Sequence, residues 1–275
     1  MRILLLGEYS RLHNSLKEGL VALGHEVIIV STGDGFKNYP ADHTIRAKWC
    51  LSRLGNIPRQ IIFRLFRFDI AALEHGLRFY FLLPKLKGVD IIQLINECTI
   101  KTTKELELLL LKRVFQQNGR LFLLSCGSDY LSIQFLLAKR NQKSILQPYF
   151  ENPSLKKEYQ YILDYTSSKQ HKIHNYIYEK CVGVIASDFD YVLPLKGNEK
   201  FLGLIPNPIN TDKLNYNDFT TGKTIVIFLG INQWNYNQKG IGYFEKALTE
   251  IKKKYPQKTE IIITKNIPYK DYINL

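Results

Sequence analysis

Short apolar runs alternate along the chain with longer segments in which apolar residues recur at helical spacing. In the first three quarters of the sequence the apolar runs lie at 3–6, 27–30, 89–95, 121–124, 182–186 and 201–205. Runs of this length are typical of strands buried on both faces. Helical spacing is clearest over 12–23, which Gly24 ends as a predicted left-handed residue, and over 102–117. The alternation predicts an α/β fold, in which helices cover both faces of a parallel sheet.

This rhythm breaks near residue 206 and then restarts. The prolines of Pro206-Asn207-Pro208 exclude regular secondary structure at that point. Beyond it the pattern predicts a strand over 224–229, a helix over 240–255, a strand over 260–264 and a further helix that opens at Pro268. We therefore expect a Rossmann-like, doubly wound domain over 1–205, a hinge over 206–222 that contains Pro206, Asn207 and Pro208, and a second Rossmann-like domain over 223–275.

The last segment supplies too few elements for a complete domain of this kind. Parallel sheets are found almost only with both faces covered, and two strands with little more than one helix do not achieve that. We expect residues 223–275 to be the first part of a domain that is cut short. The alternative is that they complete the sheet of the first domain.

The composition is that of a globular protein with a strong positive charge. Of 275 residues, 45% are hydrophobic and 23% charged, which excludes a disordered chain. No window approaches about 18 uncharged apolar residues, and the apolar start is too short for a signal peptide, so we expect a cytoplasmic protein. The net charge of +13 favours an anionic partner, which is a phosphorylated ligand, a membrane surface or nucleic acid.

The cysteines do not form a recognisable metal or disulfide pattern. Cys50, Cys98, Cys126 and Cys181 lie far apart, without a C-x-x-C pair or a histidine at ligand spacing. We expect neither a zinc site nor a disulfide scaffold, and no bound metal.

In a doubly wound sheet the loops that follow the strands carry the ligand-binding residues. The first such loop is Gly7-Glu8-Tyr9-Ser10, which has one of the three glycines of a dinucleotide-binding fingerprint. Its backbone N–H groups, next to a helix N-terminus, suit an anionic or hydroxylated ligand. Asp34 stands at roughly the ribose-binding distance, but without the glycines we interpret it as a turn residue.

Two later loops have the same relation to a strand and a helix. In Ser125-Cys126-Gly127-Ser128-Asp129 the expected N-cap is Ser128 or Asp129, and an ordinary capping turn is the alternative to a binding loop. In the loop from Gly230 to Gly240, Lys239 stands at the start of a predicted helix, where a cation can stabilise a diphosphate. A solvated surface lysine is the alternative there.

The order of several motifs resembles a known enzyme family. The motifs are Met1-Arg2-Ile3-Leu4-Leu5-Leu6-Gly7, Gly24-His25-Glu26-Val27, Gly127-Ser128-Asp129, Ile205-Pro206-Asn207-Pro208-Ile209-Asn210, Phe228-Leu229-Gly230 and Lys239-Gly240. Together they resemble the GT-B glycosyltransferases of family 4, the "glycosyl transferases group 1" type, over essentially the whole chain. The linker followed by F-L-G and K-G is the specific part.

This resemblance implies retaining transfer of a sugar from a UDP- or GDP-linked donor to an acceptor, without a metal or another cofactor. It implies that Gly7, Gly230 and Lys239 face the donor phosphates. It places Glu8, Tyr9, Ser10, Cys126, Ser128 and Asp129 on the acceptor and sugar side. Growing negative charge on the departing nucleoside diphosphate is what such cations and helix N-termini would stabilise.

The sequence also departs from the family pattern. Ile231 stands where the family usually has arginine, and Cys126 stands where it often has histidine. A thiol is a weaker hydrogen-bonding group than imidazole. The carboxylates of the family's E-x7-E signature would lie beyond Leu275, so the resemblance assigns no catalytic residue here and implies that this polypeptide is inactive by itself.

A basic stripe runs from Arg46 to Lys87, with nine lysines and arginines against two acidic residues. Apolar and cationic side chains interleave over 61–68, as in amphipathic helices that lie on anionic lipid. Arg59, Arg64 and Arg67 are the predicted membrane-surface residues. The alternative is a helix packed on the sheet with a solvated basic face. No nucleic-acid-binding motif accompanies the charge, so we expect no nucleic-acid partner.

These observations favour a cytoplasmic glycosyltransferase that acts on a cell-envelope glycan, polysaccharide or lipid-linked acceptor, peripherally at the inner face of the membrane. The alternative is a non-catalytic module that binds an acceptor or a membrane through its N-terminal domain. A different two-domain Rossmann enzyme, such as an oxidoreductase or epimerase, is disfavoured by the missing glycines.

Overall fold

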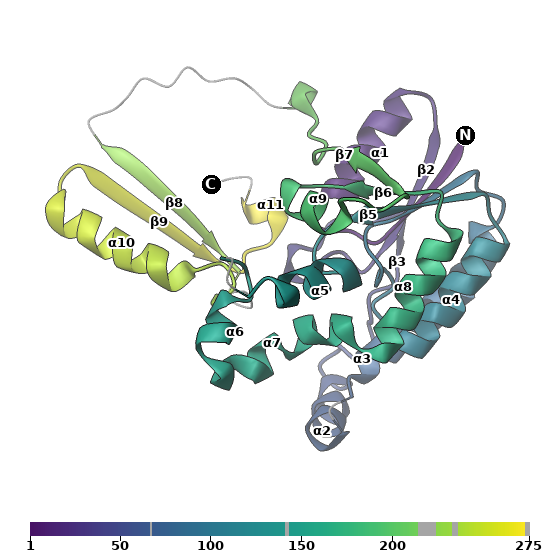
Figure 1. Ribbon diagram of the computed structural model, residues 1–275, viewed down its shortest axis with the longest axis horizontal. Coiled ribbons are helices and arrows are strands. Elements are labelled where there is room, and N and C mark those ends of the chain that lie inside the picture. Colours follow the sequence, from purple (N-terminus) through teal and green to yellow (C-terminus); the bar gives the residue numbers. More distant parts are fainter. Residues whose placement is uncertain (67, 141–142, 214–223, 233–235, 273–275) are drawn as a thin grey trace. The chain divides into compact units, whose positions relative to one another are not determined.

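The computed structural model describes residues 1–66, 68–140, 143–213, 224–232 and 236–272 (Figure 1). The chain divides into two compact units. The first unit contains Met1–Phe135 and Tyr161–Asn210, and the second contains Leu136–Gln160 and Thr211–Leu275. We expected residues 136–160 to belong to the first domain, 1–205. Instead Leu136–Gln160 groups with the C-terminal part of the chain.

The first unit is built on a seven-stranded parallel sheet. Its strands are β1 (Arg2–Leu6), β2 (Glu26–Ser31), β3 (His43–Thr44), β4 (Ile91–Leu94), β5 (Arg120–Ser125), β6 (Gly183–Ala186) and β7 (Phe201–Leu204). In space the order is β3-β2-β1-β4-β5-β6-β7, and all neighbouring strands are parallel. This confirms the predicted α/β class with a parallel sheet. The strand β3 escaped prediction because two residues give no periodic signal.

The described helices fill the connections between these strands and continue into the second unit. They are α1 (Leu12–Ala22), α2 (Asn56–Phe66), α3 (Ile70–Leu82), α4 (Lys104–Gln116), α5 (Tyr130–Ala138), α6 (Gln147–Glu151), α7 (Lys156–Leu163), α8 (Ser168–Lys180), α9 (Phe189–Leu195), α10 (Ile241–Lys254) and α11 (Tyr269–Tyr272). The helices predicted over 12–23 and 102–117 correspond to α1 and α4. Gly24 has a φ of 82°, as its predicted place after α1 requires.

Helices cover both faces of the sheet, because alternate residues of each strand point to opposite sides. In β1, Leu4 and Leu6 join a core to which α3, α4 and α8 contribute buried side chains. Ile3 and Leu5 instead lie in a second cluster that packs against α1. Figure 1 shows α4 and α8 side by side along the sheet. The first unit is therefore doubly wound, which is compatible with a Rossmann-like fold.

The second unit contains a parallel β-α-β arrangement. The strands β8 (Ile225–Ile231) and β9 (Thr259–Lys265) pair in register over their full length, and α10 connects them. They form a sheet of their own and, within the described ranges, do not join the seven-stranded sheet. The amide of Asn237 donates to a carboxylate oxygen of Glu158 at 2.8 Å, which ties the segment before α10 to Leu136–Gln160.

The segment predicted as a hinge begins without regular secondary structure. Residues 205–210 are neither helical nor in a strand, as the two prolines predict. A single 3-10 turn follows at Thr211–Lys213. The remainder of the predicted hinge, 214–222, lies outside the described residues. That Pro206, Asn207 and Pro208 act as a hinge stays a prediction.

Candidate functional site

The order in which the chain adds strands to the sheet changes side at β1. From β1 the chain proceeds to β2 and β3 on one side, then returns to β4 on the other side of β1. In open α/β sheets ligands bind outside the carboxyl ends of the strands at such a switch point. The loops that follow β1 and β4, residues 7–11 and 95–99, meet there. Sequence analysis singled out the first loop and missed the second.

Gly7 brings these two loops into direct contact. Its φ is +87°, and a Cβ atom added to it would lie 2.2 Å from Cγ2 of Ile95 and 3.0 Å from Oγ1 of Thr99. The Gly7 N–H also donates to the carbonyl of Val30 at 2.8 Å. Both the backbone conformation and the packing therefore require glycine here.

A buried histidine holds the carbonyl of Gly7. Nδ1 of His13 donates to that carbonyl at 2.7 Å, and Nε2 accepts from the amide of Gln93 at 3.2 Å. Burial lowers the pKa of His13 to about 4, so the ring is neutral in the tautomer that these two bonds need. His13 positions the loop. A histidine in the first turn of the helix after a strand-glycine loop was a signal that sequence analysis passed over.

Glu8 is a buried carboxyl with one oxygen unsatisfied. Its side chain is 1% exposed. Oε2 accepts from the backbone and the side-chain amide of Asn14, at 2.9 and 2.5 Å. Oε1 is buried without a hydrogen-bond partner among the described residues, and the same holds for Oγ1 of Thr99. Burial raises the pKa of Glu8. Buried polar atoms in folded proteins are usually satisfied, so this oxygen is a candidate ligand contact.

Two lysines flank the turn that follows Glu8. Nζ of Lys37 lies 3.1 Å from Oγ of Ser10, and Nζ of Lys101 lies 4.4 Å from the ring centroid of Tyr9. Burial lowers the pKa of Lys101, and its ammonium has no ion-pair partner within the described part of the chain. A half-buried ammonium that forms no direct ion pair favours a site for an anion.

Asp34 belongs to the same cluster. Its carboxylate accepts from the Ser10 N–H at 3.0 Å and pairs with Lys37 at 2.7 Å. Its φ of 56° lies in the left-handed region, which an aspartate in a turn tolerates. This placement agrees with the interpretation of Asp34 as a turn residue that fixes the loop after β1.

The loop after β4 contributes a carboxylate, Glu97, which contacts an imidazole from the distant helix α8. Oε1 of Glu97 lies 2.6 Å from Nδ1 of His174, and Oε2 accepts from the Gln170 amide at 2.7 Å. Tyr130 packs its ring on His174 with centroids 4.7 Å apart. A carboxylate that orients an imidazole is an arrangement that can hold or move a proton. His174 is largely buried.

A second polar link joins the β4 loop to α8. Nζ of Lys104 lies 2.9 Å from Sγ of Cys98 and 2.5 Å from Oε1 of Gln170. Burial raises the pKa of Cys98 to about 12, so the group is a thiol at neutral pH. The network fixes the loop and offers no nucleophile.

In the loop after β5, Asp129 is the N-cap of α5. Its Oδ1 accepts from the Ser132 N–H at 2.7 Å and its Oδ2 from the Ser125 hydroxyl at 2.6 Å. Both carboxylate oxygens are thus occupied within the protein. Of the predicted sugar-side residues here, Ser128 is partly exposed, and burial raises the pKa of Cys126 to about 11. The thiol of Cys126 stays protonated near neutral pH.

This arrangement predicts a structural effect at Asp129 and none at Ser128. We expect Asp129→Ala to destabilise the protein by about 2–4 kcal/mol, because it removes a cap and orphans a buried hydroxyl. Ser128→Ala should change the free energy of unfolding by less than about 0.5 kcal/mol. Urea denaturation followed by circular dichroism measures both. Equal losses at the two positions would contradict the assignment of the cap.

Of the three predicted donor-side residues, Gly7 lies in the first unit, where it packs against Ile95, and Gly230 and Lys239 lie in the second unit. Gly230 is an exposed residue within β8, and the strand ends at Ile231, which is buried. Lys239 is exposed and directly precedes Gly240, the N-cap of α10, whose φ is 64°. Lys239 therefore stands beside a helix N-terminus, as its place in the sequence predicts.

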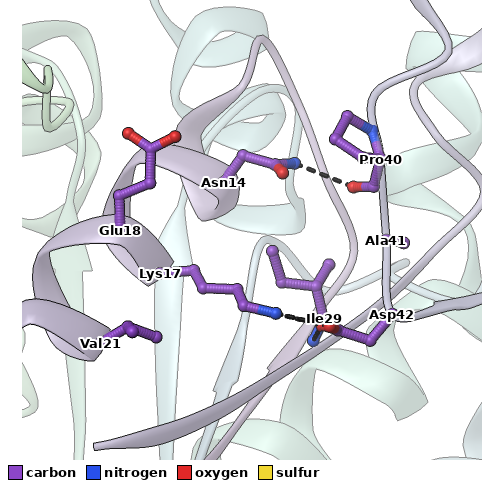
Figure 2. A pocket seen from close by; sticks show the side chains of 8 residues that line it. All are labelled: Asn14, Lys17, Glu18, Val21, Ile29, Pro40, Ala41 and Asp42. Atoms are coloured by element: carbon purple, nitrogen blue, oxygen red, sulfur yellow. Dashed lines mark hydrogen bonds and ion pairs between the residues drawn. The ribbon is translucent and has the colours of Figure 1, made fainter. Parts of the chain in front are cut away.

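A pocket of about 500 Å³ lies between α1 and residues 40–42 (Figure 2). Figure 2 shows Lys17 directed at Asp42, which it contacts at 2.5 Å, and the Asn14 amide directed at the carbonyl of Pro40, 3.1 Å away. Glu18 is paired with Arg11 at 2.6 Å. Because these charges satisfy one another, the pocket offers a ligand less than the loops after β1 and β4 do.

The described residues contain neither a cluster of metal-ligating side chains nor a membrane-spanning helix. Within these ranges no group of three or more His, Cys, Asp or Glu side chains is placed to hold a metal ion. No described helix combines the length and apolar character needed to cross a bilayer. The four cysteines form no disulfide.

Comparison with known proteins does not assign this chain to a family. No protein-family model matches the sequence, and the curated proteins contain no match to it. Its function is therefore inferred from its own residues and fold.

Proposed function

We propose that this chain takes part in glycosyl transfer of the GT-B type, with retention, from a UDP- or GDP-linked sugar to a glycan or lipid-linked acceptor. In this proposal the carboxyl edge of the seven-stranded sheet binds the acceptor, and the second unit binds the nucleotide through Gly230 and Lys239. The order of the linker, F-L-G and K-G motifs supports it. So does the parallel, doubly wound sheet of the first unit.

The single observation that carries the acceptor site is the unsatisfied Oε1 of Glu8. A buried acceptor without a donor costs about 1–3 kcal/mol, which a ligand hydroxyl would recover. Sugars present such hydroxyls. The raised pKa of Glu8 lets its carboxyl group both accept and, when protonated, donate a hydrogen bond.

The adjacent cations indicate what else the acceptor carries. Lys37 contacts Ser10 and Lys101 lies over the ring of Tyr9, so both ammonium groups are at the Tyr9-Ser10 turn. A phosphate next to them would restore the ordinary pKa of Lys101 and gain charge-assisted hydrogen bonds. The combination of a hydroxyl partner, the ammonium of Lys101 and the Asp34-paired ammonium of Lys37 fits a sugar phosphate, which is the head group of a lipid-linked acceptor.

Calorimetric titration with glucose 1-phosphate tests the acceptor site. We expect this probe to bind more tightly than glucose or inorganic phosphate alone. Glu8→Gln should weaken glucose 1-phosphate by about 10- to 100-fold and leave inorganic phosphate unchanged, whereas Lys101→Met should weaken both. Glu26→Gln and Lys87→Met, at exposed positions of the same unit, are the matched controls. Equal affinity in all variants would refute the site.

Titration with UDP and GDP tests the donor side independently. Lys239→Met removes the cation beside the N-terminus of α10 and should weaken the preferred nucleotide by about 10-fold. Lys246→Met, exposed on the same helix, is the control.

An acceptor-binding module without transfer activity is the second candidate. It is favoured by the contrast between the buried polar groups at the carboxyl edge of the large sheet and the exposed Gly230 and Lys239. Binding of glucose 1-phosphate without binding of UDP or GDP would select it over a transferase.

A further inference from the structure

The helices α2 and α3, with the segment directly before α2, carry many exposed apolar side chains. We call this region the α2–α3 surface and define it by its exposed apolar side chains: Trp49, Leu54, Ile57, Ile61, Phe63, Leu65, Phe66, Leu73, Leu77, Tyr80 and Phe81. Figure 1 shows α2 below α3, away from the sheet of the first unit. A concentration of exposed apolar side chains on neighbouring elements usually marks an interaction site in a folded protein.

The helix α2 has no buried side chain along its length. Ile57, Ile61 and Leu65 recur every four residues and form one stripe, with exposed fractions of 61%, 53% and 70%. A helix that packs on a core buries its apolar stripe, and this one presents it to solvent. The alternative of a packed helix with only a solvated basic face is therefore wrong for α2.

The helix α3 continues the exposed surface. It buries Ala71, Glu74 and Phe79 in the first unit. On the outer side Leu73, Leu77 and Phe81 again recur every four residues and are exposed. Each of the two helices thus presents a set of exposed apolar side chains.

Hydrogen bonds, an ion pair and a cation–π contact hold Trp49 in its exposed position. Glu74 accepts the backbone N–H groups of Lys48, Trp49 and Cys50 at 2.7, 3.0 and 2.8 Å. Arg78 pairs with Glu74 at 2.7 Å and lies over the Trp49 ring at 5.1 Å. The ring remains 74% exposed beside a groove of about 430 Å³ that Leu77 and Phe81 also line. An exposed tryptophan fixed in this way suits the boundary between water and lipid.

The segment from Arg46 to Lys87, which contains the α2–α3 surface, has a positive net charge and is therefore complementary to anionic lipid. Both of its acidic residues are neutralised within the protein, since Asp69 forms a two-point pair with Arg59 at 2.6 and 2.7 Å and Glu74 pairs with Arg78. Arg53 and Arg64 have no ion-pair partner among the described residues. Of the three predicted lipid contacts, Arg59 is committed to Asp69, Arg67 lies outside the described residues, and Arg64 is available.

We propose that the α2–α3 surface docks on an anionic membrane. Ile57, Ile61 and Leu65 enter the interfacial region while Arg53 and Arg64 contact lipid phosphates. This docking does not depend on the proposed sugar transfer, and the test below measures it without a sugar or a nucleotide.

Sedimentation with vesicles of phosphatidylcholine containing about one third phosphatidylglycerol tests the proposal. The protein should bind these vesicles in a salt-sensitive manner and bind pure phosphatidylcholine much more weakly. Each cation near an anionic surface contributes about 5-fold to the affinity for vesicles. The double variant R53Q/R64Q should therefore bind about 30-fold more weakly than the parent protein. I61Q/L65Q should weaken binding by at least 10-fold and leave circular dichroism unchanged, because α2 buries neither side chain.

Matched control variants test whether vesicle binding depends on where the cationic and apolar side chains lie or only on how many the protein has. K246Q/K252Q removes the same charge from exposed positions of α10, and V21Q/L109Q replaces exposed apolar residues of α1 and α4. Both should bind vesicles as the parent protein does. Binding that falls equally in the test and control variants, or is absent in the parent protein, would overturn the proposal. So would a dimer that I61Q/L65Q dissociates in the absence of vesicle binding, which would assign the surface to a second copy of the chain.

Discussion

Replacing Gly7 by alanine should destabilise the protein by about 3–4 kcal/mol, whereas the same replacement at Gly127 should cost about 1 kcal/mol. Both glycines have a positive φ, +87° and +78°. They differ in surroundings, because a Cβ atom at Gly7 would lie 2.2 Å from Cγ2 of Ile95, while one at Gly127 would meet no atom within 4 Å.

The difference between the two variants isolates the contact between the loops after β1 and β4. The backbone strain of alanine is shared and largely cancels, so the remainder measures how rigidly Ile95 is held. Urea denaturation followed by circular dichroism gives both free energies. If the two variants lost the same stability, the loops would not be packed as described, and the switch-point site would lose its structural basis.

The second large expected effect is a change in the stability of the protein with pH that depends on Glu107. This side chain is 1% exposed and accepts the N–H groups of Ile100 and Thr102 at 2.8 and 3.1 Å. Burial nevertheless raises its pKa to about 7 from an ordinary value of 4.5. Between these two values the folded protein binds more protons at this group than the unfolded chain does. Stability therefore falls as the pH rises from about 4.5 to about 7, by about 3 kcal/mol in all, and this contribution is constant outside that window.

The measurement is the difference between the unfolding free energies of the parent protein and Glu107→Gln, taken at several pH values. Relative to the parent, the variant should gain about 3 kcal/mol between about pH 4.5 and pH 7. His13 acts in the opposite sense, since its pKa of about 4 makes stability fall as the pH drops below its ordinary 6.5. Both proteins contain His13, so its contribution cancels in the difference.

Glu105→Gln is the matched control for this experiment. Glu105 lies in the same first turn of α4 but is exposed, and its side chain pairs with Lys169, which lowers its pKa. Its removal should give a small change of opposite sign. A difference profile for Glu107→Gln that is flat with pH would show that the buried carboxyl does not titrate in this range.

The site at the switch point combines acidic and basic side chains. Glu8 and Glu97 supply buried carboxylates, whereas Lys37 and Lys101 supply ammonium groups around the Tyr9-Ser10 turn. Such a mixture suits a ligand that carries both hydroxyl and phosphate groups. The α2–α3 surface lies in the same unit. If both proposals hold, docking through that surface would bring a lipid-linked acceptor close to this site.

The sequence determined the elements whose signal is local. The apolar runs gave the strands of both sheets except β3, and Gly24 and Pro208 acted through their own backbone preferences. These features depend on residues close to one another in the chain, so periodicity and turn chemistry suffice to find them. The parallel α/β class follows directly from their alternation.

Only the tertiary structure decided which polar groups act together. Glu97 and His174 are 77 residues apart, and the lysines beside the Tyr9-Ser10 turn come from two further loops. It also decided that Arg59 is paired and Arg64 is not, and that the stripe of α2 remains uncovered. Contacts between distant segments depend on strand order and on how helices pack, and neither leaves a local pattern in the sequence.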